Sequence, residues 1–324
     1  MPNFNNEPFL KEAIESILNQ DYKNFVFLII DDGSTDKSIE IIESFDDPRI
    51  KLIKKEKNTG IVDSLNIGLR EINSKYYIRM DADDISLPYR FTTLINFMEK
   101  NPEIGVCSSY LELFGETQEI WKQELKHNKI LSKFIYSTGI AHAPSIIRSN
   151  VLKNNQIEYR KTHPHLEDYD LFFRLKNLTK MATIDQVLYK YRIGKNNVTV
   201  QNRSTQNLRY KEIYKEVLTE LEIEPNEKNL CLHLEYFLNE PINSKISALI
   251  KHRNKIISKN LTLAVYPQKE LVQILDEKWE YIFYKIAPNS MGQVIAYFYF
   301  GKKIKMPQLI YLIKIKFNQL IKRK

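Results

Sequence analysis

Apolar and polar positions in the first eighty residues follow two alternating periods. Residues 7–19 place apolar side chains at helical spacing, and residues 25–30, FVFLII, form a wholly apolar run of strand formers. The same pair recurs twice, which predicts helices over about 36–45 and 59–72 and strands over 49–55 and 76–80. Strands alternating with helices in this way predict an α/β fold with a doubly wound sheet.

From about residue 206 the pattern changes to long polar stretches at helical spacing, such as LRYKEIYKEVLTELEIEP and KELVQILDEKWEYIFYKI. They predict a helical C-terminal region over 206–324 that follows an α/β domain over 1–205. The last stretch, PQLIYLIKIKFNQLIKRK, places its apolar side chains along one helical face. These side chains are Leu309, Ile310, Ile313, Phe317, Leu320 and Ile321.

Charge is concentrated in the same C-terminal segment. The formal net charge is +8, yet no acidic residue follows Glu280, whereas nine basic residues do. The remaining 39 basic residues are balanced by 40 acidic ones, which argues against a nucleic-acid-binding face on the main domain. A basic helix with an apolar stripe favours contact with an anionic membrane surface, and docking of the tail onto the first domain is the alternative.

Composition places the chain in a reducing compartment. The two cysteines, Cys107 and Cys231, provide no disulfide framework. Met1 runs directly into PNFNNEPFL, which is not a signal peptide, and apolar runs such as VIAYFYF are too short to span a bilayer. We therefore expect a cytoplasmic protein that associates peripherally with the inner face of the membrane through its tail.

Acidic residues cluster where two predicted strands end. Asp31 and Asp32 follow FVFLII, and Asp81, Asp83 and Asp84 follow YYIRM. Aspartate is common in turns after strands, so either cluster alone could be structural. In doubly wound sheets, however, ligands bind beyond the carboxyl ends of the strands, and crowded carboxylates need a positive partner. A divalent cation, Mg²⁺ or Mn²⁺, is the simplest such partner.

Three motifs in order carry a resemblance to a known family. FVFLIIDDGSTDKS, NTGIVDSLNIGL and YYIRMDADDISLPYRF resemble the inverting glycosyltransferases of family 2, which have the GT-A fold. The resemblance continues through GIAHAPSIIRSNVL and HLEDYDLFFRL to LYKYRIGKNNVT and covers about residues 1–200. It implies transfer of a sugar from a nucleotide-diphosphate sugar, with UDP the expected nucleotide, to a glycan or lipid-linked acceptor of a cell-surface polysaccharide.

The resemblance also implies roles for individual residues. Asp83 matches the metal-binding acid of the DxD motif, with Asp84 the next candidate, and Asp168 in LEDYD matches the catalytic base. An amphipathic helix start with acids in its first turn is the structural alternative for LEDYD. The residues expected around the nucleotide, sugar and phosphates are Pro2, Phe4, Asn5, Asp31, Asp32, Gly60, Asn66, Asp81 and His142.

Two features depart from the family pattern. Many members carry a histidine that completes the metal site where this chain has Gly194. The family also begins with a strand that leads into the loop represented here by PNFN, and this chain lacks that strand because it starts at Met1. We expect either an assigned start that is too late or a truncated chain. A non-catalytic subunit of the same pathway is accordingly the alternative function.

Overall fold

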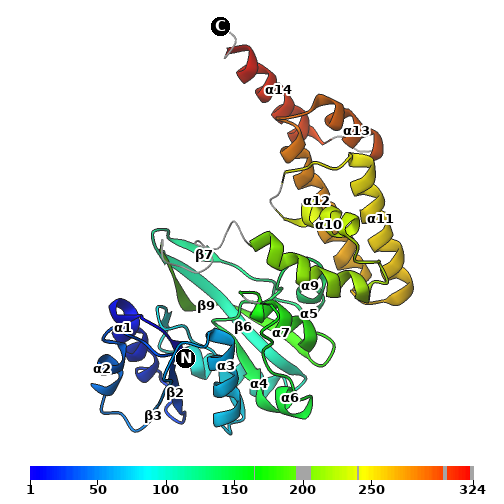
Figure 1. The fold of residues 1–324 in the computed structure, drawn as a ribbon. Coiled ribbons are helices and arrows are strands. Elements are labelled where there is room, and N and C mark those ends of the chain that lie inside the picture. The colour runs from blue at the N-terminus through cyan, green and yellow to red at the C-terminus, as the bar shows by residue number, and fades with distance from the viewer. Residues whose placement is uncertain (164, 195–205, 239–240, 302–304, 322–324) are drawn as a thin grey trace. The chain divides into compact units, whose positions relative to one another are not determined.

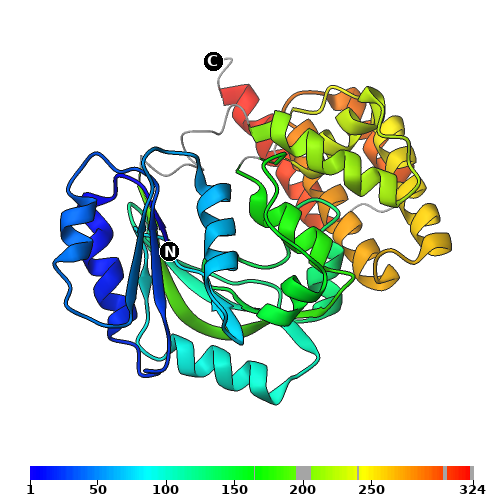
Figure 2. The same cartoon turned by 60° about the horizontal axis from the view of Figure 1, so that its bottom comes forward.

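The computed structural model describes the chain except for residues 164, 195–205, 239–240, 302–304 and 322–324 (Figures 1 and 2). The chain divides into two compact units, Met1–Arg209 and Tyr210–Lys324. The first unit contains two β-sheets with their covering helices, and the second contains helices.

The smaller sheet of the first unit is wholly parallel. Its strands are β1 (Pro2–Asn3), β2 (Phe27–Asp31) and β3 (Ile50–Lys54), in the spatial order β1-β2-β3. Every residue of β2 is buried, as expected for a central strand covered on both faces. Helices α1 (Glu7–Leu18), α2 (Ser38–Glu43) and α3 (Ile61–Glu71) connect the strands, which confirms the predicted alternation.

The larger sheet is mixed, with the strand order β4-β8-β6-β9-β5 and β7 paired to β6. Its long central pair, β6 and β9, runs parallel, whereas β8 is antiparallel to both β4 and β6. These strands are β4 (Tyr76–Ile78), β5 (Ile85–Ser86), β6 (Ile104–Gly115), β7 (Glu119–Trp121), β8 (Ile146–Arg148) and β9 (Lys180–Ile193).

Helices cover both faces of this larger sheet. Figure 2 shows α4 on one side and the helices α6 and α7 on the other. The helices of this part are α4 (Arg90–Lys100), α5 (His127–Lys133), α6 (Ser149–Asn154) and α7 (Glu167–Leu175).

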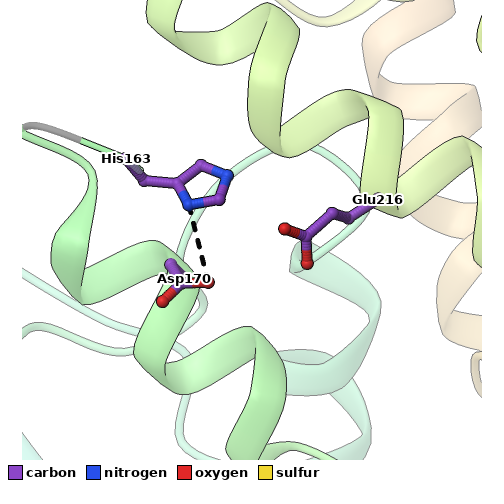
Figure 3. Close-up of side chains that lie close together, drawn as sticks. All are labelled: His163, Asp170 and Glu216. Carbon is purple, nitrogen blue, oxygen red and sulfur yellow. Dashed lines mark ion pairs between the residues drawn. The ribbon is translucent and has the colours of Figure 1, made fainter. Parts of the chain in front are cut away.

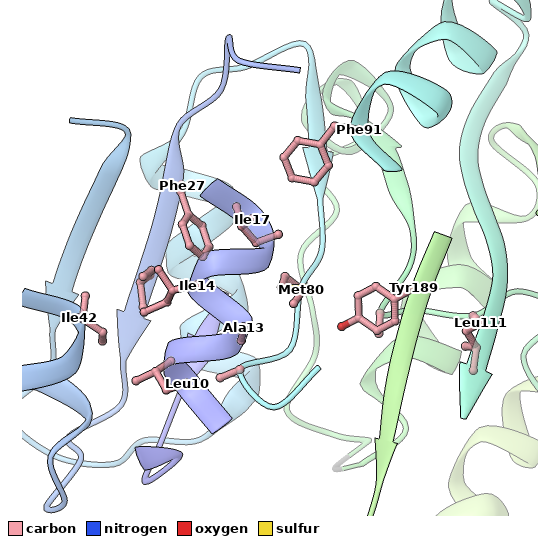
Figure 4. Close-up of a cluster of buried hydrophobic side chains, with 14 residues drawn as sticks. Leu10, Ala13, Ile14, Ile17, Phe27, Ile42, Met80, Phe91, Leu111 and Tyr189 are labelled. Carbon is pink, nitrogen blue, oxygen red and sulfur yellow. The ribbon is translucent and has the colours of Figure 1, made fainter. Parts of the chain in front are cut away.

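Helix α1 anchors one hydrophobic core of the first unit. Pro8 lies in its first turn, where a missing N–H is tolerated, and its apolar residues recur every three or four positions. The side chains of Leu10, Ile14 and Ile17 are buried together with Phe27 of β2 (Figure 4). The same cluster extends to Met80, Phe91, Leu111 and Tyr189, so it reaches from the smaller sheet to the larger one.

A cavity of about 810 Å³ lies between β2 and β4. In the described part of the chain, β4 pairs with β8 alone, and β1 pairs with β2 only at the two residues Pro2 and Asn3. The expected gap in the sheet is therefore present, but it is shorter than expected because Pro2–Asn3 fill one end. Apolar residues line the cavity, among them Ile17, Phe27, Leu28, Leu65, Leu69, Ile72, Tyr77, Ile78 and Phe91.

The amino group of Met1 lies at the end of this cavity. It donates a hydrogen bond to the carbonyl oxygen of Leu28 at 2.8 Å, and the Met1 carbonyl accepts from the Ile30 N–H at 3.0 Å. Met1 thus extends the parallel ladder by one residue. Burial lowers the pKa of the amino group to about 5 because the charged form is poorly solvated there.

The second unit contains helices throughout its described residues, which confirms the predicted helical C-terminal region. The indole of Trp279 stacks on the ring of Tyr297 with centroids 4.8 Å apart, and Gln308 donates to the Tyr297 hydroxyl at 3.1 Å. No helix among the described residues is both long and apolar enough to cross a membrane. The helices are α9 (Gln206–Glu220), α10 (Glu227–Phe237), α11 (Ile246–Leu263), α12 (Gln268–Ile286), α13 (Met291–Gly301) and α14 (Met306–Ile321).

The cavity beside β2 generates a prediction about stability. We expect a five-residue extension of valine and isoleucine before Met1 to raise the melting temperature by roughly 5 °C or more, because each buried aliphatic side chain contributes about 1.5–3 kcal/mol. Calorimetry measures this change. An extension of equal length with proline at alternate positions is the control, since proline cannot donate to the ladder. Equal melting temperatures for both extensions would contradict the prediction.

Candidate active site

The carboxylate of Asp31 ties the N-terminal loop to the turn after β2. Its Oδ2 accepts hydrogen bonds from the Asn3 side-chain amide and the Ser34 hydroxyl, both at 2.7 Å. Asp31 is completely buried, so these bonds replace the water that the carboxylate loses. The predicted nucleotide-binding loop is therefore held to the sheet by one of the predicted acids.

Asp32 shapes a second loop at the same edge of the smaller sheet. Its carboxylate accepts from the backbone N–H groups of Thr59 and Gly60 at 3.0 and 2.9 Å. Lys55 forms an ion pair with Asp32 at 2.5 Å and with Asp63 at 2.9 Å. Gly60 has a φ of 94°, which favours glycine, so its predicted importance has a local structural reason.

The N-terminal loop itself presents an exposed aromatic ring. Phe4 is 43% exposed, directly after Pro2 and Asn3 of β1. Asn5 adopts a positive φ of 50°, and its side-chain oxygen accepts the backbone N–H of Thr35 at 2.8 Å. The loops after β1 and β2 are thus hydrogen-bonded to each other, and the Phe4 ring remains accessible to a planar ligand.

The loop after β4 brings three carboxylates together. Asp81 forms an ion pair with Arg79, whereas Asp83 and Asp84 have no ion pair among the described residues. Burial, and then the charge of Asp81, raise the pKa of Asp83 to about 6. The same two causes, in that order, raise the pKa of Asp84 well above its ordinary value. Two carboxyl groups in this loop therefore lack a full positive partner.

Arg192 of β9 holds this acidic loop in place. Its backbone N–H donates to Asp84 Oδ1 and its Nε donates to the carbonyl oxygen of Asp83, both at 2.7 Å. The guanidinium lies 4.4 Å from the ring centroids of both Phe9 and Phe114. These contacts fix the backbone of the loop, so the carboxylates do not need to move far to bind a cation.

The acidic loop fits a divalent cation. Asp84 is only 1% exposed, and its Oδ2 is buried without a hydrogen-bond partner among the described residues. A buried carboxylate oxygen without a partner is unfavourable, and hard cations such as Mg²⁺ and Mn²⁺ prefer such ligands. Asp83, which remains partly exposed, offers a second carboxylate of the same type. The predicted pair of ligands is therefore chemically suitable.

The first turn of α7 supplies a second pair of acids, Glu167 and Asp168. Burial, and then the neighbouring Asp168, raise the pKa of Glu167 to about 7. Burial likewise raises the pKa of Asp168, whose Oδ1 accepts the Tyr169 N–H at 2.7 Å. The Tyr169 hydroxyl donates to the Phe134 carbonyl oxygen at 2.7 Å and anchors the helix. An acid with a raised pKa at a helix N-terminus suits a proton-accepting role.

Asp170, two residues farther along α7, has a structural role. It is completely buried and binds Arg174 at 2.7 Å, and His163 Nδ1 lies 3.7 Å from its Oδ1 (Figure 3). Arg174 also donates to the Glu158 carbonyl oxygen at 2.7 Å. Asp170 therefore secures the segment 158–163 against α7. His163 is buried and contacts this anchor; the sequence THPHLED had suggested only that it lies near the proposed base.

His142 belongs to a hydrogen-bonded chain that includes Tyr159. Its Nε2 lies 2.8 Å from the Tyr159 hydroxyl, while the side chain of Asn66 bonds both the N–H and the carbonyl oxygen of Tyr159, at 2.8 and 2.9 Å. Burial, and then the charge of Arg79, hold the pKa of His142 well below its ordinary value. His142 is therefore neutral at pH 7, and Asn66 positions Tyr159 rather than facing an open site.

The charge of Arg79 acts on both sets of acids. It opposes the rise in pKa that burial causes at Asp83, Glu167 and Asp168. Sequence reasoning missed Arg79, Tyr159 and Arg192. Two of them had a signal, because Arg79 lies inside YYIRMDADD and Arg192 precedes the noted Gly194 by two residues.

Gly194 follows the end of β9, and residues 195–205 beyond it lie outside the described part of the chain. Whether another side chain takes the place of the expected histidine near Gly194 stays an open prediction.

The two sheets, their helices and the acids at the carboxyl edge define the class of protein. The chain has the GT-A fold of nucleotide-sugar-dependent glycosyltransferases. Among solved structures, S. aureus TarS 1–349 in complex with UDP-GlcNAc superposes with a TM-score of 0.58 at 16% identity, covering 80% of this chain and 79% of that one. The chain spans 52% of a longer TarS structure.

Sequence relatives then give the family. Residues 1–160 match the model of glycosyl transferase family 2. An uncharacterized glycosyltransferase of Haemophilus influenzae is 35% identical over 67% of this chain and 71% of its own length. The Escherichia coli UDP-Glc:alpha-D-GlcNAc-diphosphoundecaprenol beta-1,3-glucosyltransferase WfgD is 25% identical over 61% of this chain and 78% of its own length. The chain belongs to glycosyl transferase family 2 and is a glycosyltransferase.

The crowded acids predict the effect of removing one of them. We expect Asp83→Ala to abolish the rise in melting temperature that UDP produces in the presence of Mn²⁺. Without metal the variant should be as stable as the parent or more so, because like charges no longer repel. Differential scanning fluorimetry with Asp185→Ala, an exposed acid of β9, as the control measures both effects. Full metal-dependent stabilisation of the Asp83 variant by UDP would show that the site is misassigned.

Proposed function

We propose that the protein transfers a hexosyl or N-acetylhexosaminyl group, with inversion, from a UDP-sugar to a glycan or lipid-linked acceptor in the assembly of a cell-surface polysaccharide. The observation that carries this proposal is the acidic loop after β4, where the buried Oδ2 of Asp84 has no hydrogen-bond partner among the described residues, in a chain of glycosyl transferase family 2. A donor-binding acid and a proton-accepting acid are what a single displacement requires.

The donor binds across the carboxyl edge of the sheets. Phe4 and the loop Pro2–Asn5 contact the base, with Asp31 and Asp32 holding the loops around it and Gly60 approaching the ribose and diphosphate. Asp83 and Asp84 would hold Mg²⁺ or Mn²⁺, which would supply positive charge to stabilise the leaving diphosphate. Asp81 and Arg192 keep the acidic loop in position around this site.

Asp168 acts as the general base. Its raised pKa makes it a stronger proton acceptor than an ordinary carboxylate, and it takes the proton of the acceptor hydroxyl as that oxygen attacks the anomeric carbon. The diphosphate leaves from the opposite face, so the configuration inverts and no covalent intermediate forms. Neutral His142, bonded to the Tyr159 hydroxyl, can donate a hydrogen bond to the donor phosphates or accept one from the acceptor hydroxyl.

A non-catalytic role in the same pathway is the second candidate. Gly194 favours it, because many family members carry at this position a histidine that completes the metal site. Donor binding without transfer by the parent protein, in the assay below, would identify this function.

The assignment of the base predicts a separation of binding from chemistry. Asp168→Asn keeps the size of the side chain and loses its basicity, so transfer should fall by a factor of roughly 10² to 10⁴ while UDP-sugar affinity is retained. Turnover and binding are measured with UDP-glucose, UDP-galactose and their N-acetylamino forms, each with Mn²⁺. Near-normal turnover of the variant would remove Asp168 from the mechanism.

Helices α13 and α14 support contact with a membrane surface. Ile295, Tyr299 and Ile313 are 67%, 77% and 68% exposed, and Ile310 is 48% exposed. Such exposure of large apolar side chains is unusual for a surface that faces water alone. Lys314 is exposed on the same helix as Ile310, whereas the side chains of Phe317, Leu320 and Ile321 and residues 322–324 lie outside the described part of the chain. A lipid-linked acceptor would be concentrated at such a surface.

The exposed apolar residues predict binding to anionic lipid. The full chain should sediment with vesicles that contain phosphatidylserine and be released by high salt, because surface electrostatics are screened. Ile310→Glu combined with Ile313→Glu should reduce the bound fraction at least tenfold. Leu261→Glu is the matched control, since Leu261 is 71% exposed on α11. Equal loss of binding in both variants, or no binding by the parent, would contradict a membrane role for α14.

A further inference from the structure

Arg79 is a largely buried cation at the start of the acidic loop. It follows β4 directly, its side chain is 10% exposed, and it forms an ion pair with Asp81. Its Nε is buried and has no hydrogen-bond acceptor among the described residues. Burial disfavours its charge, but the Asp81 carboxylate outweighs burial and raises the pKa of Arg79. The guanidinium is therefore permanently charged.

The other arginines near the acidic loop make different contacts. Arg192 directs its Nη2 to Glu12 at 2.6 Å and its Nε to a backbone carbonyl oxygen. Arg90 donates to the carbonyl oxygens of Arg79 and Ala143 at 2.7 and 3.0 Å. Arg79, in contrast, forms an ion pair with Asp81, a carboxylate of the acidic loop. While that pair persists, Oδ1 of Asp81 is bound to the guanidinium and cannot coordinate a metal ion.

The pairing has an electrostatic consequence for a divalent cation. A cation that enters alone meets the remaining acids but also the positive charge of Arg79, and Asp81 can join the cation only if its own pair breaks. A nucleotide diphosphate brings negative charge into the same region and offsets the repulsion from Arg79. The site is therefore suited to a cation and a diphosphate together rather than to either one alone.

We propose that Arg79 is a positioning residue. Its ion pair keeps Asp81 from coordinating the divalent cation, so binding of the cation depends on the nucleotide diphosphate. This inference rests on the proposed function, because it takes Asp83 as a metal ligand. Arg79 does not contact the reacting atoms in this proposal. It acts through Asp81, and its positive charge partly balances the negative charge of the acidic loop before the donor binds.

The test is a titration of the full-length protein with Mn²⁺, followed by its melting temperature, with and without saturating UDP. In the parent protein, Mn²⁺ alone should have little effect and Mn²⁺ with UDP a large one. In Arg79→Met, Asp81 is released, so Mn²⁺ alone should stabilise the protein and its half-maximal concentration should fall at least tenfold. Arg79→Lys keeps the charge and should restore the parent response.

Arg148→Met is the matched control. Arg148 is also partly buried, but its guanidinium donates to the carbonyl oxygens of Met98 and Ile104 and lies over the Tyr76 ring. Its loss should lower stability without changing the response to Mn²⁺. The same change in the Arg79 and Arg148 variants, or none in Arg79→Met, would overturn the inference.

Asp81→Asn provides a test that does not depend on the folding of Arg79→Met. Because Arg79 rather than the cation holds Asp81, this variant should keep the half-maximal Mn²⁺ concentration in the presence of UDP within about threefold, whereas Asp83→Ala should lose the response. Loss of the response in Asp81→Asn as well would overturn the inference. A parent protein that never responds to Mn²⁺ and UDP would overturn the proposed metal site together with this inference.

Discussion

Repulsion among carboxylates at the carboxyl edge of the sheets is the constraint on which the site depends. Asp81, Asp83 and Asp84 lie within four residues, and Glu167 and Asp168 approach the same region from α7. In water such a group would spread apart, but burial and short loops prevent this. The ion pair of Arg79 with Asp81 and the hydrogen bonds from Arg192 to the loop offset part of this repulsion. The negative charges of Asp83 and Asp84 are left without an ion-pair partner among the described residues. Binding of a cation and a diphosphate can relieve what remains.

The same principle organises the nucleotide side of the site by a different means. Asp31 and Asp32 are almost fully buried, yet hydrogen bonds from Asn3, Ser34, Thr59 and Gly60, together with Lys55, satisfy them. These carboxylates hold loops instead of waiting for a ligand. The first unit thus contains two kinds of acid. Asp31 and Asp32 have full hydrogen-bond or ion-pair partners and stabilise loops, whereas Asp83 and Asp84 lack a full set of such partners among the described residues and are suited to binding a ligand.

Much of the fold was predictable because local patterns decided it. FVFLII became the buried strand β2, and the apolar spacing of residues 7–19 became α1 with Leu10, Ile14 and Ile17 in the core. The placement of acids after strands was likewise predictable from the topology. The family resemblance supplied Asp168, which no periodicity would have distinguished from an ordinary helix start.

The rest depended on contacts between distant residues. Asn66 meets Tyr159 across 93 positions of sequence, and Arg192 meets Asp84 across 108. No local pattern contains such partners, so Tyr159 could not be assigned a role from sequence. The position of Arg79 inside YYIRMDADD did not by itself reveal its ion pair with Asp81. The helices and strands could be predicted from the sequence, but the hydrogen bonds between residues far apart in the sequence could not.

The division of the chain into two compact units bears on how such proteins diversify. Trp279, Phe283 and Tyr297 form aromatic contacts with one another within the helical unit, and Leu10, Ile14 and Phe27 pack within the first unit. A substitution in one core therefore has little direct effect on the packing of the other. Selection can therefore alter the packing of the helical unit while the carboxylates of the first unit keep their environment.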